Sequence, residues 1–271
     1  MEPVGEHPVP AGPLAVRWLG YELPELRAGT TGTLRVRARN AGSAAWRSRG
    51  EAGVQASYHW LDPLGNAIVW DGPRTAFAEP VAPGAEAELA LELRSPRPPG
   101  RYRLAVDLVE EHRYWFAEVG SSPLELDVDV RPRIDERRLA VVVHGGADEA
   151  TSASLAAQEE AIVREGAVAT AHLVAGAEPE PDWSRRLLDA HAEGFVAVGG
   201  SVESRERSLR PWAPGGGRNP SFDRPLLFPS LLAGFEPTTY EGLPAYEPLD
   251  AEPWLYDGRI RLRLPRGRRR A

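Results

Sequence analysis

Two glycine-rich segments, around residues 145 and 200, have the side chains that a hydrolytic site would use. Glycine amides in His144-Gly145-Gly146 follow an apolar run and suit an oxyanion-binding loop, and Gly199-Gly200-Ser201 places a serine among small residues. A nucleophile turn needs glycine two residues after the serine, whereas Glu203 stands there. All six histidines precede Ser201, so the order of a serine–acid–histidine triad is missing. The pattern argues against a hydrolase.

The same glycines suit a second chemistry, the binding of a ligand at the ends of parallel strands. Glycine lets backbone amides approach a phosphate, and ligands bind outside the carboxyl ends of such strands. Neither segment matches a dinucleotide-binding or P-loop motif. The candidate edge consists of His144, Gly145, Gly146, Gly199, Gly200, Ser201 and Glu203. Plain turns at the strand ends are the alternative interpretation.

A third candidate is the proline- and glycine-rich loop of residues 211–220, which contains Trp212, Arg218 and Asn219. Arginine offers a planar fork for phosphate or carboxylate, and tryptophan stacks on sugar faces. Arg218 equally suits a structural role, in which it ties the loop to the first half of the chain through backbone carbonyls.

In the first half, one interpretation is an aromatic and polar groove for a glycan, made of His59, Trp70, Asp71, Arg74 and Tyr114. The competing interpretation places Trp70 and Tyr114 in the core and makes Asp71 and Arg74 a structural ion pair at a turn. The histidines lack the spacing of metal ligands, so we expect neither a metal nor a cofactor. We assign no catalytic residue.

Alternating apolar and polar residues predict an all-β domain over residues 14–131. The central element is a hairpin over residues 54–75, in which Val54, Ala56, Tyr58 and Trp60 share one face. Its turn is Asp62-Pro63-Leu64-Gly65. Alternation in the other strands places apolar residues inward and charged residues, Asp107 among them, outward. About seven such strands favour an immunoglobulin-like β-sandwich, with most of its tryptophans in or around the core.

The arginine-rich strand at residues 34–39 and the glutamate-rich strand at residues 88–93 suit two arrangements. As neighbours in one sheet they gain cross-strand attraction, and as separate strands they are independently solvated.

The second half, residues 139–265, changes to the pattern of a small α/β domain. Strands are expected at 139–143, 168–175 and 195–198, a helix from Thr151 or Ser152 to about Glu165, and another from Asp182 to Ala192. This order predicts a short parallel sheet with right-handed crossovers. After residue 210 the chain is expected to be irregular, with a short helix near Ser230 and an edge strand at 259–264.

Composition limits the setting in which the protein works. The net charge of −7 argues against nucleic-acid binding, and the absence of cysteine excludes disulfides and thiolate chemistry. Residues 1–13 lack the features of a signal peptide and no apolar run approaches a membrane span, so we expect a cytoplasmic protein. Residues 1–13 are expected to be a disordered tail, 132–138 a charged linker and 266–271 a solvated basic tail.

A family resemblance covers about residues 30–130. The residues that carry it are Asn40, Gly42, Trp46, Tyr58-His59-Trp60, Asp62, Gly65, Trp70-Asp71-Gly72, Arg74-Thr75, Pro83-Gly84, Pro99-Gly100-Arg101-Tyr102, Asp107-Leu108-Val109-Glu110, Trp115-Phe116 and Gly120. This string resembles the immunoglobulin-like modules of bacterial glycan-assembly proteins, such as the carbohydrate-binding C-terminal domain of O-antigen ABC-transporter ATPases. The resemblance implies a glycan or a glycosyltransferase as the partner.

The second half is weakly similar to family 2 glycosyltransferases. Gly215-Gly216-Gly217-Arg218-Asn219 and Gly234-Phe235-Glu236 stand in comparable order, but no Asp-x-Asp motif occurs in this half. The first functional hypothesis is therefore a non-catalytic glycan- or partner-binding protein of surface-polysaccharide assembly. The alternatives are a glycosyltransferase-like domain that acts on a nucleotide-sugar and a protein–protein scaffold.

Overall fold

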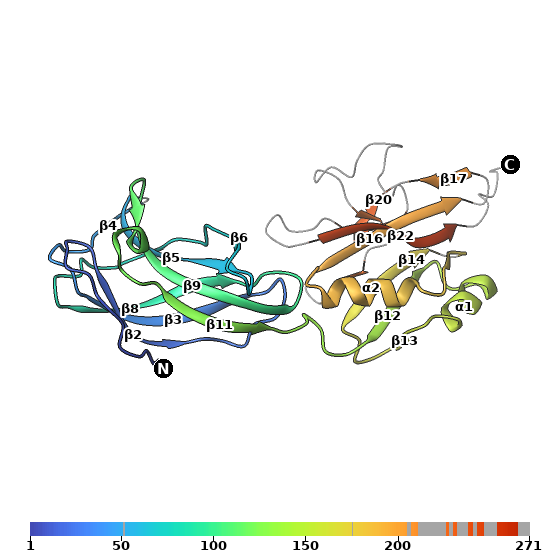
Figure 1. Cartoon of the computed structure of the whole chain (residues 1–271). Helices are drawn as coiled ribbons and strands as arrows, with labels where there is room; N and C mark the ends of the chain where they lie inside the picture. Colours follow the sequence, from blue (N-terminus) through green and yellow to red (C-terminus); the bar gives the residue numbers. More distant parts are fainter. Residues whose placement is uncertain are drawn as a thin grey trace. The chain divides into compact units, whose positions relative to one another are not determined.

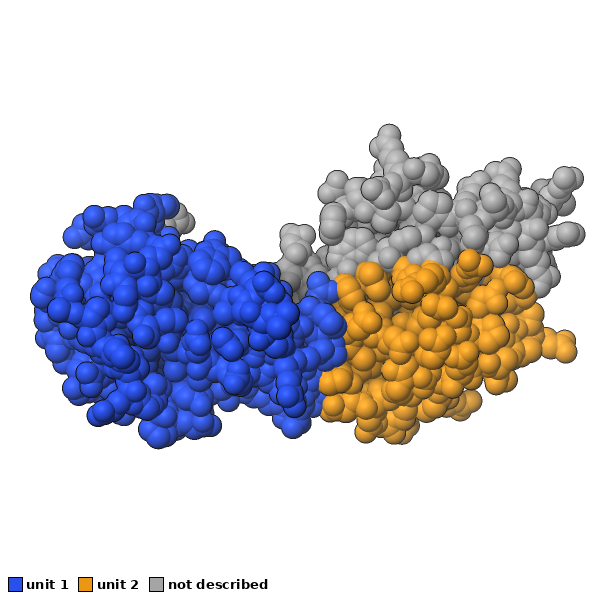
Figure 2. Space-filling model, in the orientation of Figure 1, with its two compact units in different colours: residues 1–131 blue, residues 132–271 orange. Residues whose placement is uncertain are grey.

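The computed structural model describes residues 1–50, 52–174, 176–204, 207–210, 226–227, 230–231, 238–240, 243–246 and 254–264. The chain forms two compact units, residues Met1–Arg131 and Pro132–Ala271 (Figures 1 and 2). Each unit has a hydrophobic core of its own. Among the described helices, none has the length and apolar character that a membrane span requires.

The first unit is a sandwich of two β-sheets. Its strands are β1 Glu2–Pro3, β2 Val16–Glu22, β3 Thr31–Asn40, β4 Ser48–Arg49, β5 Ala52–Leu61, β6 Ala67–Val69, β7 Thr75–Ala76, β8 Glu86–Arg94, β9 Gly100–Glu110, β10 Tyr114–Trp115 and β11 Leu124–Val130. One sheet has the order β1-β2-β3-β8, and in the other β5 and β11 flank β9. This division of successive strands between two sheets is that of an immunoglobulin-like sandwich.

Period-two alternation builds the sandwich core. Strand β3 buries Leu34, Val36 and Ala38 and exposes the arginines between them. Strand β3 pairs with β8, and Arg39 lies opposite Glu86 with its guanidinium 2.5 Å from the carboxylate. The two oppositely charged strands are therefore neighbours in one sheet, where an exposed cross-strand pair contributes about 0.2–1 kcal/mol.

Tryptophan and tyrosine side chains complete this core. Trp18, Trp46 and Trp60 are buried in it, as the sequence predicts for most tryptophans of this half. Near the start of β9, the Tyr102 hydroxyl donates a hydrogen bond to the Pro98 carbonyl at 2.5 Å. This is the tyrosine corner of immunoglobulin-like domains, in which the hydroxyl ties a strand to the backbone just upstream.

Residues 1–13 are expected to be a disordered tail, but their first residues form a strand. Strand β1 pairs with β2, and the Tyr21 hydroxyl donates a hydrogen bond to Glu2 at 2.7 Å. An apolar side chain at Val4 also packs against the core. Strand pairing thus orders residues that composition alone marks as polar and proline-rich.

The second unit contains a mixed β-sheet with two helices. The strands of this sheet are β12 Arg138–His144, β13 Ala161–Ile162, β14 Ala169–Val174, β15 Glu178–Pro179, β16 Ala197–Ser204, β17 Arg207–Arg210, β19 Ser230–Leu231 and β22 Trp254–Leu264. Strand β12 is parallel to β13 and β14, and β16 is parallel to β22, whereas β19 joins β14 to β16 with antiparallel pairing. Strands β18 Leu226–Leu227, β20 Thr238–Tyr240 and β21 Leu243–Tyr246 form a separate sheet.

Helices α1 Glu149–Ala156 and α2 Trp183–Ala192 belong to this unit. Helix α2 packs on the sheet and buries Trp183, Leu187 and Leu188 in the unit's core (Figure 1). Its position agrees with the helix expected after Asp182.

Helix α1 differs from the expected helix at both ends. It begins after Asp148, whose carboxylate accepts a hydrogen bond from the Thr151 amide at 2.8 Å, so neither Thr151 nor Ser152 is the N-cap. It ends at Ala156 rather than near Glu165. The side-chain amide of Gln158 takes the place of a backbone donor at this end, with a hydrogen bond to the Ser154 carbonyl at 3.1 Å. Residues 161–162 then pair with β12 as strand β13 instead of continuing the helix.

Three further expectations for this half are wrong. Residues 199–201 are not a turn after a strand but part of β16, where they pair with β22. Ser230 lies in strand β19 and not in a helix. Strand β22 pairs with β16 on one side and with β15 on the other, so residues 259–264 are not an edge strand.

Position 200 requires glycine because the backbone of β22 approaches it closely. A Cβ atom there would lie 2.3 Å from the Ile260 carbonyl oxygen. We therefore expect Gly200→Ala to force the two strands apart and to lower the free energy of unfolding of the second unit by about 1–3 kcal/mol. Urea denaturation measures the change. Gly12→Ala, at a position with nothing within 4 Å, is the control, and an equally small effect of both variants would contradict the prediction.

Candidate functional site

The outer face of the sheet that contains β5 and β9 is buried, although it points away from the sandwich core. Gln55, Ser57 and His59 on β5 are 5%, 0% and 6% exposed. Ser57 donates a hydrogen bond to the Gly72 carbonyl at 2.8 Å, and the ring of His59 contacts Trp115. The segments around residues 70–74 and 114–119 therefore form a second layer over this face.

His59 holds two tryptophans together. Its ring stacks on Trp70 with centroids 4.1 Å apart and meets Trp115 edge-on at 4.2 Å. One ring nitrogen, Nδ1, contacts the carbonyl oxygen of Trp70. Burial lowers the pKa of His59, although the contact with this carbonyl opposes the shift. A neutral imidazole that donates from Nδ1 thus fixes both the backbone and the ring of Trp70.

Arg74 joins the second layer to the sheet. Its guanidinium pairs with the carboxylates of Asp71, at 3.0 Å, and Glu111. It also donates to the Ser57 hydroxyl at 3.1 Å and lies 4.9 Å from the centre of the Trp115 ring. An arginine that bridges two carboxylates and lies over an indole ring is a rigid element of the face.

Asp107 on β9 lies under this layer and is fully buried. Its two oxygens accept hydrogen bonds from the amides of Leu108 at 2.8 Å and Ala117 at 3.0 Å. Burial raises the pKa of Asp107 to about 7, against the effect of these two hydrogen bonds. The expectation that Asp107 faces solvent is therefore wrong, because helix η1 Phe116–Val119 and Trp115 cover it.

Trp70 is 53% exposed, although its ring is stacked on a buried partner. We call the set of Trp70, His59 and Trp115 the Trp70 platform. The interpretation of Trp70 as a core residue is wrong, whereas the Asp71–Arg74 ion pair of that interpretation is present. Tyr114 does not join the platform: it packs against the sandwich core, with the Arg113 guanidinium 5.4 Å from its ring.

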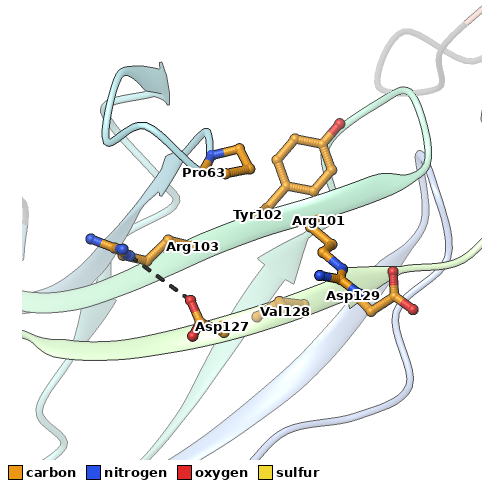
Figure 3. Close-up of a pocket in the computed structure, with 7 residues that line it drawn as sticks. All are labelled: Pro63, Arg101, Tyr102, Arg103, Asp127, Val128 and Asp129. Atoms are coloured by element: carbon orange, nitrogen blue, oxygen red, sulfur yellow. Dashed lines mark ion pairs between the residues drawn. The ribbon is translucent and has the colours of Figure 1, made fainter.

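A pocket of about 390 Å³ lies farther along β9 (Figure 3). It is lined by Pro63, Arg101, Tyr102, Arg103, Asp127, Val128 and Asp129. Arg103 lies opposite Asp127 on β11, with its guanidinium 3.9 Å from the Asp127 carboxylate. It is also two residues before Ala105, which pairs with His59 on β5. Since residues two apart on a strand share a face, Arg103 and the Trp70 platform lie on the same side of the sheet.

The predicted edge of the second unit does not converge. His144, at the end of β12, lies three strands from Ser201 and Glu203 on β16, because β14 and β19 stand between. At about 4.8 Å per strand this separation is about 14 Å. Gly145 and Gly146 have φ values of 87° and 83°, as the interpretation of a plain turn expects. Trp212, Arg218 and Asn219 lie outside the described residues.

Within the described ranges, no group of three histidine or acidic side chains is arranged to hold a metal ion. No protein-family model matches the sequence, and no curated protein matches it.

Among solved structures, the CARDB domain of a Pyrococcus furiosus protein, crystallised in complex with di-metal ions, is similar at 18% identity over 43% of this chain and 86% of that chain, with a TM-score of 0.28. A family 123 glycoside hydrolase from Clostridium perfringens is similar at 9% identity over 48% of this chain and 26% of that chain, with a TM-score of 0.25. A PapD-like domain of human CEP192 is similar at 14% identity over 47% and 88%, with a TM-score of 0.19.

Proposed function

We propose that the first unit is a glycan-binding module and that the chain is a cytoplasmic, non-catalytic protein of bacterial surface-polysaccharide assembly. The observation that carries the proposal is the Trp70 platform. A half-exposed indole that stacks on a buried imidazole, 4.1 Å away, presents a flat apolar face that stays ordered without a ligand. Preorganised aromatic faces bind with little loss of side-chain entropy, and the C–H face of a sugar ring is a suitable partner.

Polar groups beside the platform suit the hydroxyls of a glycan. The Asp71 side chain is 63% exposed, and Arg74 holds it in place. The charged pocket of Arg103 and Asp127 adds hydrogen-bond donors and acceptors on the same face. A chain of sugars that stacks on Trp70 can therefore extend along β9 toward this pocket. Assignment of the second unit to the α/β class is part of the same proposal, supported by its parallel pairs and its two helices.

The test is a thermal-shift and calorimetric screen of the full chain against bacterial surface polysaccharides. We expect at least one polysaccharide to raise the melting temperature by linkage, and Trp70→Ala to weaken its binding at least tenfold. The matched control is Ile68→Ala, which removes another exposed apolar side chain from the same hairpin, 44% exposed against 53% for Trp70. The proposal fails if no polysaccharide binds, or if Trp70→Ala binds as tightly as the wild type.

A protein partner is the second candidate, favoured by exposed apolar side chains on the β5–β6 hairpin. Leu64 is 88% exposed, and Ile68 and Val69 are exposed beside Trp70. Aromatic and aliphatic residues of this kind anchor protein interfaces. If the hairpin binds a glycosyltransferase, Ile68→Ala and Trp70→Ala should weaken capture of that enzyme together, whereas a glycan site responds to Trp70 alone.

A further inference from the structure

A cleft of about 620 Å³ opens in the second unit, where β22 passes the start of α2. It is lined by Glu159, Glu180, Pro181, Asp182, Arg186, Arg259, Arg261 and Arg263. Three of its four arginines come from β22. Arg261 and Arg263 are alternate residues of a regularly paired stretch and share one face, whereas Arg259 lies in a bulge of the strand opposite β16. The volume falls within the range of about 300–1,000 Å³ that small-molecule sites occupy.

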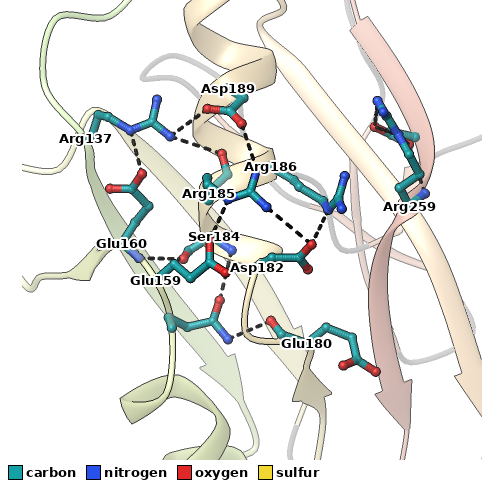
Figure 4. Close-up of polar contacts among 12 residues, drawn as sticks. Arg137, Glu159, Glu160, Glu180, Asp182, Ser184, Arg185, Arg186, Asp189 and Arg259 are labelled. Carbon is teal, nitrogen blue, oxygen red and sulfur yellow. Dashed lines mark hydrogen bonds and ion pairs between the residues drawn. The ribbon is translucent and has the colours of Figure 1, made fainter.

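Each carboxylate of the cleft already has an arginine partner, and Figure 4 shows those of Glu159 and Asp182. The pairs are Glu159 with Arg185 at 2.5 Å, Asp182 with Arg186 at 2.5 Å and Glu180 with Arg263 at 2.8 Å. Arg259 pairs at 2.7 Å with Asp257, which lies outside the lining. These pairs balance the acidic charge and hold the guanidiniums in fixed positions around the cleft.

Arg261 differs from its neighbours. Its side chain is exposed and forms no ion pair within the described part of the chain. Its backbone is fixed, because the Arg261 carbonyl accepts a hydrogen bond from the Glu180 amide at 3.2 Å. The cleft therefore contains one arginine whose five N–H donors are not engaged by any side chain of the described residues, between two arginines that are already paired.

We propose that this cleft binds a diphosphate group, with Arg261 as the main contact and Arg259 and Arg263 on either side. A guanidinium pairs with phosphate oxygens through two parallel hydrogen bonds. Arg261 and Arg263 are alternate residues of a regularly paired stretch and so are about 6.8 Å apart, which suits two linked phosphates better than one. The site belongs to the second unit and is independent of the glycan site proposed for the first.

Isothermal titration calorimetry of the full chain with inorganic pyrophosphate tests the proposal. We expect Arg261→Gln to weaken pyrophosphate binding about tenfold, because one charge-assisted bidentate contact is lost. Arg35→Gln, which removes an exposed arginine without an ion-pair partner among the described residues of the first unit, should leave it unchanged. Orthophosphate and citrate should both bind more weakly than pyrophosphate.

Four results would overturn the diphosphate site. These are no pyrophosphate binding at physiological ionic strength, equal affinity of Arg261→Gln and the wild type, an equal loss in Arg35→Gln, and citrate binding as tight as that of pyrophosphate. If circular dichroism shows that Arg261→Gln is unfolded, Arg261→Lys replaces it. Lysine keeps the charge but lacks the planar fork, so weaker binding supports the proposal and unchanged binding contradicts it.

Discussion

Asp107→Asn should make the first unit less sensitive to pH. In the wild type the folded-state pKa of Asp107 is about 7, compared with an ordinary value of 3.8. Between these two values the folded protein binds a proton that the unfolded chain has released. A rise in pH from about 4 to 7 therefore lowers the free energy of unfolding, by about 4 kcal/mol for this one group. Asparagine cannot titrate, so this contribution disappears.

Hydrogen exchange of the Leu104 and Val106 amides, in the buried centre of β9, measures this free energy in the full chain. At about pH 4 the variant should be less stable than the wild type by about 1 kcal/mol, since its amide group faces a backbone N–H and one hydrogen bond is lost. The order should reverse near pH 5, and by about pH 7 the variant should be more stable than the wild type by about 3 kcal/mol. Asp127→Asn, at a side chain that is 96% exposed, should follow the wild-type curve. Parallel curves for Asp107→Asn and the wild type would show that Asp107 does not titrate in this range.

Trp60→Ala should destabilise the sandwich by about 3–5 kcal/mol, since the truncation of a fully buried tryptophan leaves a large cavity. The indole lies edge-on to Tyr58 and Tyr102, with centroids 6.3 and 6.1 Å away. Its N–H donates to the Arg94 carbonyl at 2.9 Å, so the variant also loses a hydrogen bond between the two sheets. Urea denaturation followed by circular dichroism measures the change.

Trp70→Ala is the matched control for Trp60→Ala, because both tryptophans belong to the same hairpin. Trp70 is half exposed, and its main-chain carbonyl, which contacts His59, is kept in the variant. Its truncation should therefore cost about 1 kcal/mol or less. A similar cost for the two variants would mean that the core does not depend on Trp60 as the burial pattern indicates.

The alternation of apolar and polar residues was enough to predict the sandwich, but it does not indicate which segments cover the outer face of a sheet. On β3 the outward residues are arginines, and that face is exposed. On β5 the outward residues are Gln55, Ser57 and His59, none of which is an arginine or a carboxylate. Outward positions without charged side chains indicate that another segment covers this face of the sheet. Asp107 on β9 is paired with Ser57 on the same face, so this signal predicts that Asp107 is buried.

The candidate glycan site was predicted better than the candidate edge of the second unit. His59, Trp70, Asp71 and Arg74 converge because a short hairpin brings its own ends together. Glu111 and Trp115 were missed, since they reach the site through the long-range pairing of β5 with β9. His144 and Ser201 are far apart because β14 and β19 lie between their strands. Strand β19 comes later in the sequence than both residues, so the order of elements up to Ser201 does not reveal its insertion.

The position of β22 in its sheet also determines when each half can fold during synthesis. The last strand of the sandwich, β11, ends at Val130, so the first unit can close once that residue has left the ribosome. The second sheet has to wait for residues 254–264, because β22 lies between β16 and β15. Strand β16 ends at Ser204, and the 60 residues from there to Leu264 take on the order of 5 s to translate. During that time the edge of β16 that later pairs with β22 is open, and an open strand edge is a site for chaperone binding and for aggregation.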